Sequence, residues 1–204
     1  LKVYDKPILY FPKFFHPDPT VKRQSGFLMP MLSASNNLGN YLSVPYFYAI
    51  SDSKDLTFTP RFYDKQKTIY QAEYRQANKN SDHIIDFSIL NKSRLLLKGG
   101  KTKGTHFFTK SNFDIDVSFF ENSKIDINIQ QVSEDNYLKT HKLKSPLINS
   151  ETVLNSKIEF EGSNENLDLN LFTEVFEDLS KETTDRYEYI LPSYNLTRYL
   201  ESSL

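Results

Sequence analysis

The sequence predicts an all-β fold, an antiparallel meander of about ten long strands that forms part of a β-barrel. Apolar and polar residues alternate with a period of two, which places the two kinds of side chain on opposite faces of a strand. Aromatic residues make up 14% of the chain, all of them Tyr or Phe, and they suit pleated surfaces. No stretch of helical length shows a competing 3.6-residue period.

Two hairpins carry the clearest alternation. The apolar residues of 113–119 alternate with polar ones, and after a turn-like 121–124 the pattern resumes over 125–130. It returns at 158–161 and, across 162–166, at 167–171. Each pair of runs predicts a hairpin.

Further strands are expected where β-forming residues gather between polar connections. These segments are 26–35, 41–50, 56–63, 68–77, 84–97, 105–119 and 186–199. The connections near 51–55, 78–82, 121–124 and 162–166 are short, whereas those at 135–150 and 179–185 are longer. Such alternation is typical of outer-membrane barrels.

The first 23 residues differ from the rest. Pro7, Pro12, Pro17 and Pro19 punctuate this segment, and prolines at that density exclude a central strand. We expect a short proline-rich edge strand and linker over 1–23, with the barrel strands occupying 24–204. Because the chain opens with Leu1 and has no charged-then-apolar leader, we also expect a piece of a longer protein.

Composition excludes several classes. The net charge of -1 argues against a nucleic-acid binder, and the absence of cysteine excludes thiolate metal sites within the chain. The chain contains no run of about 18 apolar residues, so it is not predicted to have a membrane-spanning helix. The mean hydropathy of -0.54 does not exclude a membrane barrel, whose strands alternate between the two environments.

Three prolines are spaced evenly: Pro30, Pro45 and Pro60 lie fifteen residues apart, one in each of the first three predicted strands. Antiparallel partners have a constant index sum, so we predict these prolines at one height across the sheet. Proline lacks the N–H that a ladder needs, so one of the two adjacent pairs should lose both hydrogen bonds. Alternatively, the prolines mark strand ends or bulges.

The first strand is apolar on both faces, at Phe27, Leu28, Met29, Met31 and Leu32. An apolar patch facing a barrel lumen would suit passing acyl chains; equally, another element could cover it.

Polar residues of the regular strands are predicted to line a hydrated lumen. They are Asp114, Asp116, Ser118, Asp126, Asn128, Gln130, Glu159, Glu161, Asp168 and Asn170. Paired carboxylates can also act in a glycosidase, but positions on a repeating polar face favour the lumen. The four histidines show no metal-ligand spacing, and we expect no metal, cofactor or catalytic site. Acidic residues from 174 to 185 could hold divalent cations, although a solvated loop explains them as well.

Several segments resemble one family. They are 7–12, 23–30, 35–37, 42–48, 55–61, 132–138 and 189–192, and in this order they resemble the lipopolysaccharide-assembly protein LptD family, also called organic solvent tolerance protein. The likeness covers nearly the whole chain.

The resemblance implies a large barrel in the outer membrane of a Gram-negative bacterium, following a periplasmic jelly-roll domain whose end would be residues 1–23. It implies transport of lipopolysaccharide into the outer leaflet, with the lipoprotein LptE in the barrel, the bridge protein LptA in the periplasm and outer-membrane lipids around it. Pro30 and Pro45 match the gate prolines of the family, and we add Pro60 together with Phe27, Met29 and Met31. Energy would come from an inner-membrane ATPase, so the chain needs no cofactor and is not expected to be an enzyme.

Two other functions compete. Another outer-membrane barrel, such as a porin or receptor, would share every periodicity. A soluble β-sandwich that binds carbohydrate would have strands of about five to six residues, so strand length separates these classes.

Overall fold

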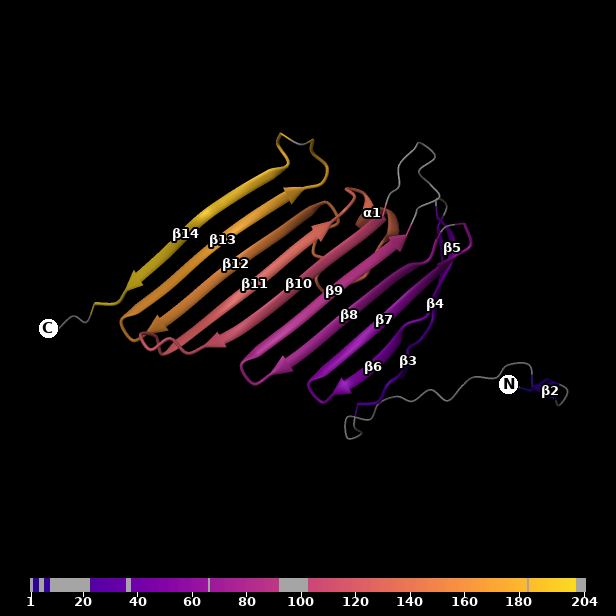
Figure 1. Cartoon of the computed structure of the whole chain (residues 1–204), viewed down its shortest axis with the longest axis horizontal. Helices are drawn as coiled ribbons and strands as arrows, with labels where there is room; N and C mark the ends of the chain where they lie inside the picture. The colour runs from indigo at the N-terminus through magenta and orange to yellow at the C-terminus, as the bar shows by residue number, and fades with distance from the viewer. Residues whose placement is uncertain are drawn as a thin grey trace.

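The computed structural model describes residues 2–3, 6–7, 23–35, 38–65, 67–91, 103–182 and 184–200. Almost all of its regular structure is antiparallel strand, laid side by side in one sheet (Figure 1). The interrupted first strands are β3 (Gly26–Phe27), β4 (Met31–Ser35), β5 (Gly39–Ser43) and β6 (Tyr46–Ser51). The long strands are β7 (Lys54–Tyr63), β8 (Ile69–Asn78), β9 (Ser81–Asn91), β10 (Lys103–Ile115), β11 (Asn122–Val132), β12 (Val153–Asn164), β13 (Leu167–Asp178) and β14 (Tyr187–Arg198).

The sheet is a meander. Its twelve strands follow one another from β14 back to β7, which pairs with both β5 and β6. If β3 with β4 and β5 with β6 are each counted as one interrupted strand, the sheet has ten. The prediction of an antiparallel meander of about ten long strands is therefore confirmed. The described sheet does not close on itself, as expected for part of a larger barrel.

The N-terminal segment is described only in part. β1 (Lys2–Val3) pairs with β2 (Lys6–Pro7) in a separate two-stranded sheet. The remainder of the predicted edge strand and linker, residues 8–22, lies outside the described residues, as do residues 92–97 of the predicted strand 84–97.

Short and long connections lie at opposite ends of the strands (Figure 1). Two residues connect β6 to β7, β8 to β9 and β12 to β13, whereas residues 133–152 connect β11 to β12 at the opposite end of the strands. The short α1 helix (Tyr137–His141) lies in that long connection, where no helix was predicted. No helix of the described part is long and apolar enough to cross a membrane.

One turn was predicted in the wrong place. β10 ends at Ile115 and β11 already begins at Asn122, so the connection is 116–121 rather than 121–124. The pairing of Ile115 with Ser123 centres the hairpin on Phe119. Asp116 and Ser118, predicted as lumen-facing strand residues, consequently lie in the connection. Alternation continued past the end of the strand and concealed the turn.

The two faces of the sheet differ in chemistry. One is polar, as shown by the cross-strand row of Asp114, Lys124, Glu161 and Asn170, because paired residues share a face. The other presents exposed apolar side chains. Examples from its central strands are Phe58, Tyr70, Phe87, Ile89, Phe107 and Ile158. Within the described residues no second sheet covers this face, and strands of ten to thirteen residues do not fit the sandwich alternative.

Candidate functional site

The first two strands are interrupted side by side. Residues 28–30 separate β3 from β4, and Val44 and Pro45 separate β5 from β6. β3 pairs with β6 and β4 with β5, so the two interruptions lie next to each other at the free edge of the sheet. We call this place the proline break.

The prolines do not face one another, contrary to the prediction. The Leu28 N–H donates to the Pro45 carbonyl at 2.9 Å, and the Val44 N–H donates to the Pro60 carbonyl at 3.2 Å. The turn between β6 and β7 is centred as predicted, since Ser51 pairs with Lys54. A register irregularity between Ala49 and Ser51 then shifts the pairing by one residue. Alternation cannot reveal such a bulge, which adds a residue to one strand only.

The loss of hydrogen bonds is therefore staggered. A hydrogen-bonded antiparallel pair exchanges two bonds, and proline cannot supply its half. The pairs Leu28 with Pro45 and Val44 with Pro60 each keep one bond and lose one. The prediction was that one proline pair would lose both bonds, and neither of these pairs does. Each missing bond forfeits about 0.5–1.5 kcal/mol. The two losses lie at successive strand pairs approaching the free edge.

Apolar side chains surround the proline break. Phe27 is 76% exposed and Met29 74% exposed, and Met31 is also exposed. The Phe27 ring meets Tyr46 edge-on, with ring centroids 5.0 Å apart. No described element covers these side chains, so the first strand presents them at the edge where the described sheet ends.

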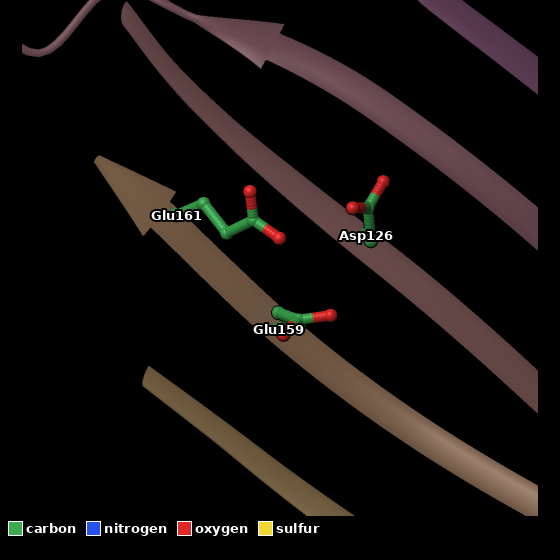
Figure 2. A group of neighbouring side chains, drawn as sticks. All are labelled: Asp126, Glu159 and Glu161. Carbon is green, nitrogen blue, oxygen red and sulfur yellow. The ribbon is translucent and has the colours of Figure 1, made fainter. Parts of the chain in front are cut away.

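Eight of the ten residues predicted to line a lumen share the polar face. They are Asp114, Asp126, Asn128, Gln130, Glu159, Glu161, Asp168 and Asn170. Figure 2 shows the carboxylates of Asp126, Glu159 and Glu161 converging from β11 and β12, with oxygen atoms within 4.8 Å of one another.

Two lysines already compensate these carboxylates. Lys124 Nζ lies 3.3 Å from Asp126 and 3.1 Å from Glu161, while Lys157 Nζ lies 2.8 Å from Glu159. Asn170 also donates to Glu159 at 2.7 Å. Two positive charges thus offset all but one of the three negative charges of this cluster.

The long connection folds back onto the polar face, which sequence reasoning missed. Leu138, Leu143 and Leu147 of residues 133–152 join a buried cluster with Ile69, Leu90 and Phe108 of the strands. A Cβ at Gly104 would collide with the Tyr137 ring, so glycine there permits the close approach. The sequence did contain a sign of this packing. Apolar residues occupy polar-face positions at the strand ends next to the long connection, and leucines within the connection are available to cover them.

Polar strand side chains also bind the backbone of this connection. Arg61 Nη1 donates to the carbonyls of His141 at 3.2 Å and Lys142 at 3.3 Å. Gln71 donates to the Lys144 carbonyl at 2.9 Å, and Gln130 to that of Leu147 at 2.8 Å. These bonds hold residues 133–152 over the sheet.

Buried titratable groups lie beneath the connection. His106 Nε2 is 3.3 Å from Asp86 without hydrogen-bond geometry, and its Nδ1 is 2.6 Å from the Ser88 hydroxyl. Ser88 also contacts the Tyr137 hydroxyl at 2.8 Å. Burial, aided by the charge of Arg61, lowers the pKa of His141 to about 4, and burial raises that of Tyr137 to about 12. Both loop side chains are therefore uncharged near neutral pH.

A single antiparallel sheet, polar on one face and apolar on the other and extended by long strands, defines a barrel-forming β-sheet protein. Its distinguishing features are the proline break at one edge and the connection folded onto the polar face. The chain belongs to the family described as LptD protein, whose sequence model matches residues 1–199.

Relatives carry the same description. The chain is similar to the LPS-assembly protein LptD of Pseudoalteromonas translucida, at 31% identity over 68% of this chain and 18% of the relative. It is 27% identical to that of Legionella pneumophila strain Paris over 68% of this chain and 18% of the relative. For that of Pseudomonas aeruginosa the values are 33%, 45% and 10%. The matched segment thus spans less than a fifth of each of these relatives.

Proposed function

We propose that this chain supplies the first strands of an outer-membrane barrel that transports lipopolysaccharide and inserts it into the outer leaflet. The family match over residues 1–199 carries this proposal, and the relatives are named for lipopolysaccharide assembly. The function is transport rather than catalysis. In this proposal the apolar face contacts lipid and the eight polar-face residues line the lumen.

The lateral gate lies at the proline break. Pro45 and Pro60 remove donors at two successive strand pairs, and Pro30 lies in the interruption of the first strand. Carbonyls left unbonded in a bilayer cost several kcal/mol each, so this edge parts more easily than uninterrupted strands. Phe27, Met29 and Met31 would contact acyl chains at the opening.

The remaining assignments follow the family. Residues 1–23 end a periplasmic domain that faces the bridge protein LptA, and residues 24–204 begin the barrel that holds the lipoprotein LptE. The protein resides in the outer membrane of a Gram-negative bacterium. A porin or receptor would have the same two-faced sheet; the family match and the proline break favour lipopolysaccharide transport.

Depletion of the full-length protein tests the transport function. Newly made lipopolysaccharide should stop reaching the cell surface and should return when the wild-type gene is supplied. Continued arrival at the normal rate would contradict the proposal.

A second experiment tests the gate. Restoring both donors with Pro45→Ala and Pro60→Ala should slow surface delivery in complemented cells without reducing the amount of folded barrel. Pro146→Ala is the matched control, because Pro146 is exposed in the long connection and lies far along the chain from the break. Equal delivery by the double variant and the control would remove the gate from this edge.

A further inference from the structure

A small cavity lies on the polar face beside the proline break. Its volume is about 170 Å³, and Met31 and Pro45 of the interrupted strands contribute to its wall. The polar lining consists of Ser43, Thr57, Thr59, Arg61, Glu73 and Lys144. Since one water molecule occupies about 30 Å³ of liquid, the cavity has room for a group of about five non-hydrogen atoms.

Arg61 is the most unusual residue of this lining. It is only 5% exposed, and its Nη atoms bond two backbone carbonyls and the Gln71 side chain. Its Nε is buried and has no hydrogen-bond partner. No carboxylate of the described residues forms an ion pair with it, and a buried charge without a counter-charge is costly.

The carboxylate that Gln71 links to Arg61 is already engaged. Gln71 separates Arg61 from Asp86, accepting from Arg61 at 3.4 Å and donating to Asp86 at 3.1 Å and 3.2 Å. Asp86 in turn lies 3.3 Å from His106. Arg61 therefore has no carboxylate partner among the described residues, and its charge is offset only by the Tyr41 ring of the cavity wall, whose centroid lies 5.7 Å from the guanidinium carbon.

The other lining groups favour an anion with several oxygen atoms. Lys144 adds a second positive charge from the long connection, while Glu73 adds one negative charge that lies 3.5 Å from Arg75. The hydroxyls of Ser43, Thr57 and Thr59 make no hydrogen bonds within the described residues. A phosphate group offers three strong acceptor oxygens, and arginine with lysine is a usual pair for binding it.

We propose that this cavity binds a phosphate group, with Arg61 and Lys144 as its cations. The proposal rests on the transport function above, because the phosphate is then one carried by the glycolipid headgroup as its acyl chains leave at the adjoining break. Free phosphate has the same chemistry, and the experiment separates the two sources.

The test uses the complete protein, purified in detergent, and three probes. They are a short-chain, bisphosphorylated glucosamine disaccharide, the same disaccharide without phosphates, and inorganic phosphate, each titrated by calorimetry. The wild type should bind the phosphorylated disaccharide at least about tenfold more tightly than the unphosphorylated one, as expected for charge-assisted hydrogen bonds. Arg61→Gln should remove most of this preference, and Arg61→Lys should restore part of it.

Lys144→Gln keeps the test decisive if Arg61→Gln fails to fold. Lys144 is exposed, so its replacement should spare the barrel while weakening the phosphate preference about threefold, a loss smaller than that of a full charge-assisted bond. Lys139→Gln is the matched control, since Lys139 is an exposed lysine of the same connection outside the cavity. Its preference should equal that of the wild type.

Competition by inorganic phosphate would show that phosphate alone fills the site, whereas Arg61-dependent binding without competition would identify the headgroup. A wild type that ignores the phosphates, or cavity variants that keep the full preference, would overturn the proposal. Depletion that still blocks surface delivery would then leave the transport function standing. Normal delivery after depletion would remove that function without altering the binding result.

Discussion

The edge formed by β3–β6 and the body formed by β8–β13 differ in how completely their strands are paired by backbone hydrogen bonds. In the body, long strands pair without a proline, and β12 with β13 keeps one register over twelve residue pairs. At the edge, short strands meet around prolines, and two successive strand pairs each lack a donor. These missing donors therefore lie at the edge of the sheet and not in its body.

The two regions also differ in what covers the polar face. Residues 133–152 pack against strands of the body through a buried apolar cluster on this face, whereas Met31 of the first strand, which shares the face through its row with Ser43 and Arg61, is exposed. Stability and openness are thus separated within one sheet. Changes that make one region resemble the other give the sharpest tests.

The largest effect should follow from introducing a proline into the body. Ile127→Pro removes a donor in the middle of β11, between Ser111 of β10 and Ile158 of β12. Because an orphaned carbonyl in lipid costs several kcal/mol, the folded barrel seen by heat-modifiable electrophoresis should be lost. Ile127→Ala keeps the donor and should fold. Normal folding of the Ile127→Pro variant would show that the body tolerates a missing donor as well as the edge does.

Truncating the buried cluster should have the next largest effect. Phe108 is fully buried beneath the connection, so Phe108→Ala should cost about 3–5 kcal/mol and expose residues 133–152 to protease. The neighbouring Phe107 lies on the opposite, exposed face, and Phe107→Ala is the control. Equal protection of the connection in both variants would show that the cluster does not hold it.

Acid should release the same connection. Burial and the charge of Arg61 lower the pKa of His141 to about 4, against about 6.5 in an exposed histidine. The released form then takes up the proton more readily. The docked form is accordingly stable above about pH 6.5 and loses up to about 3 kcal/mol as the pH falls toward 4.

Limited proteolysis between about pH 7 and pH 4.5 measures this release, within the window that the two pKa values define. His141→Gln cannot gain the charge, so its connection should show much less dependence on pH. Identical profiles for the wild type and this variant would assign the acid effect to other groups.

The smallest effect should come from repairing the edge. Pro60→Ala supplies an N–H opposite the Val44 carbonyl and should add about 1 kcal/mol, which slows hydrogen exchange over β5 and β6. Thr59→Ala next to it changes no donor and serves as control. Unchanged exchange in Pro60→Ala would mean that the missing bond does not weaken this edge.

The period-two pattern predicted most of the fold correctly. Alternation fixes which residues share a face without reference to anything distant in the chain, so the hairpin of residues 158–171 and the polar-face positions could be predicted from neighbours alone. The same argument failed at Asp116 and Ser118, where alternation persists beyond the end of β10.

Register at the proline break was beyond the sequence. Equal spacing of Pro30, Pro45 and Pro60 gave the correct turn between β6 and β7, yet one irregularity near Ile50 placed Pro60 opposite Val44 instead of Pro45. A bulge depends on how neighbouring strands fit, and no residue type marks it uniquely.

The sequence by itself determined a two-faced antiparallel sheet with short turns at one end of its strands, because these follow from residue period and turn composition. Only the tertiary structure decided which missing bonds lie side by side, how residues 133–152 cover the polar face, and why Arg61 is buried beside a cavity. Those outcomes depend on contacts between residues tens of positions apart, such as Arg61 with His141, and local patterns carry no information about such distances.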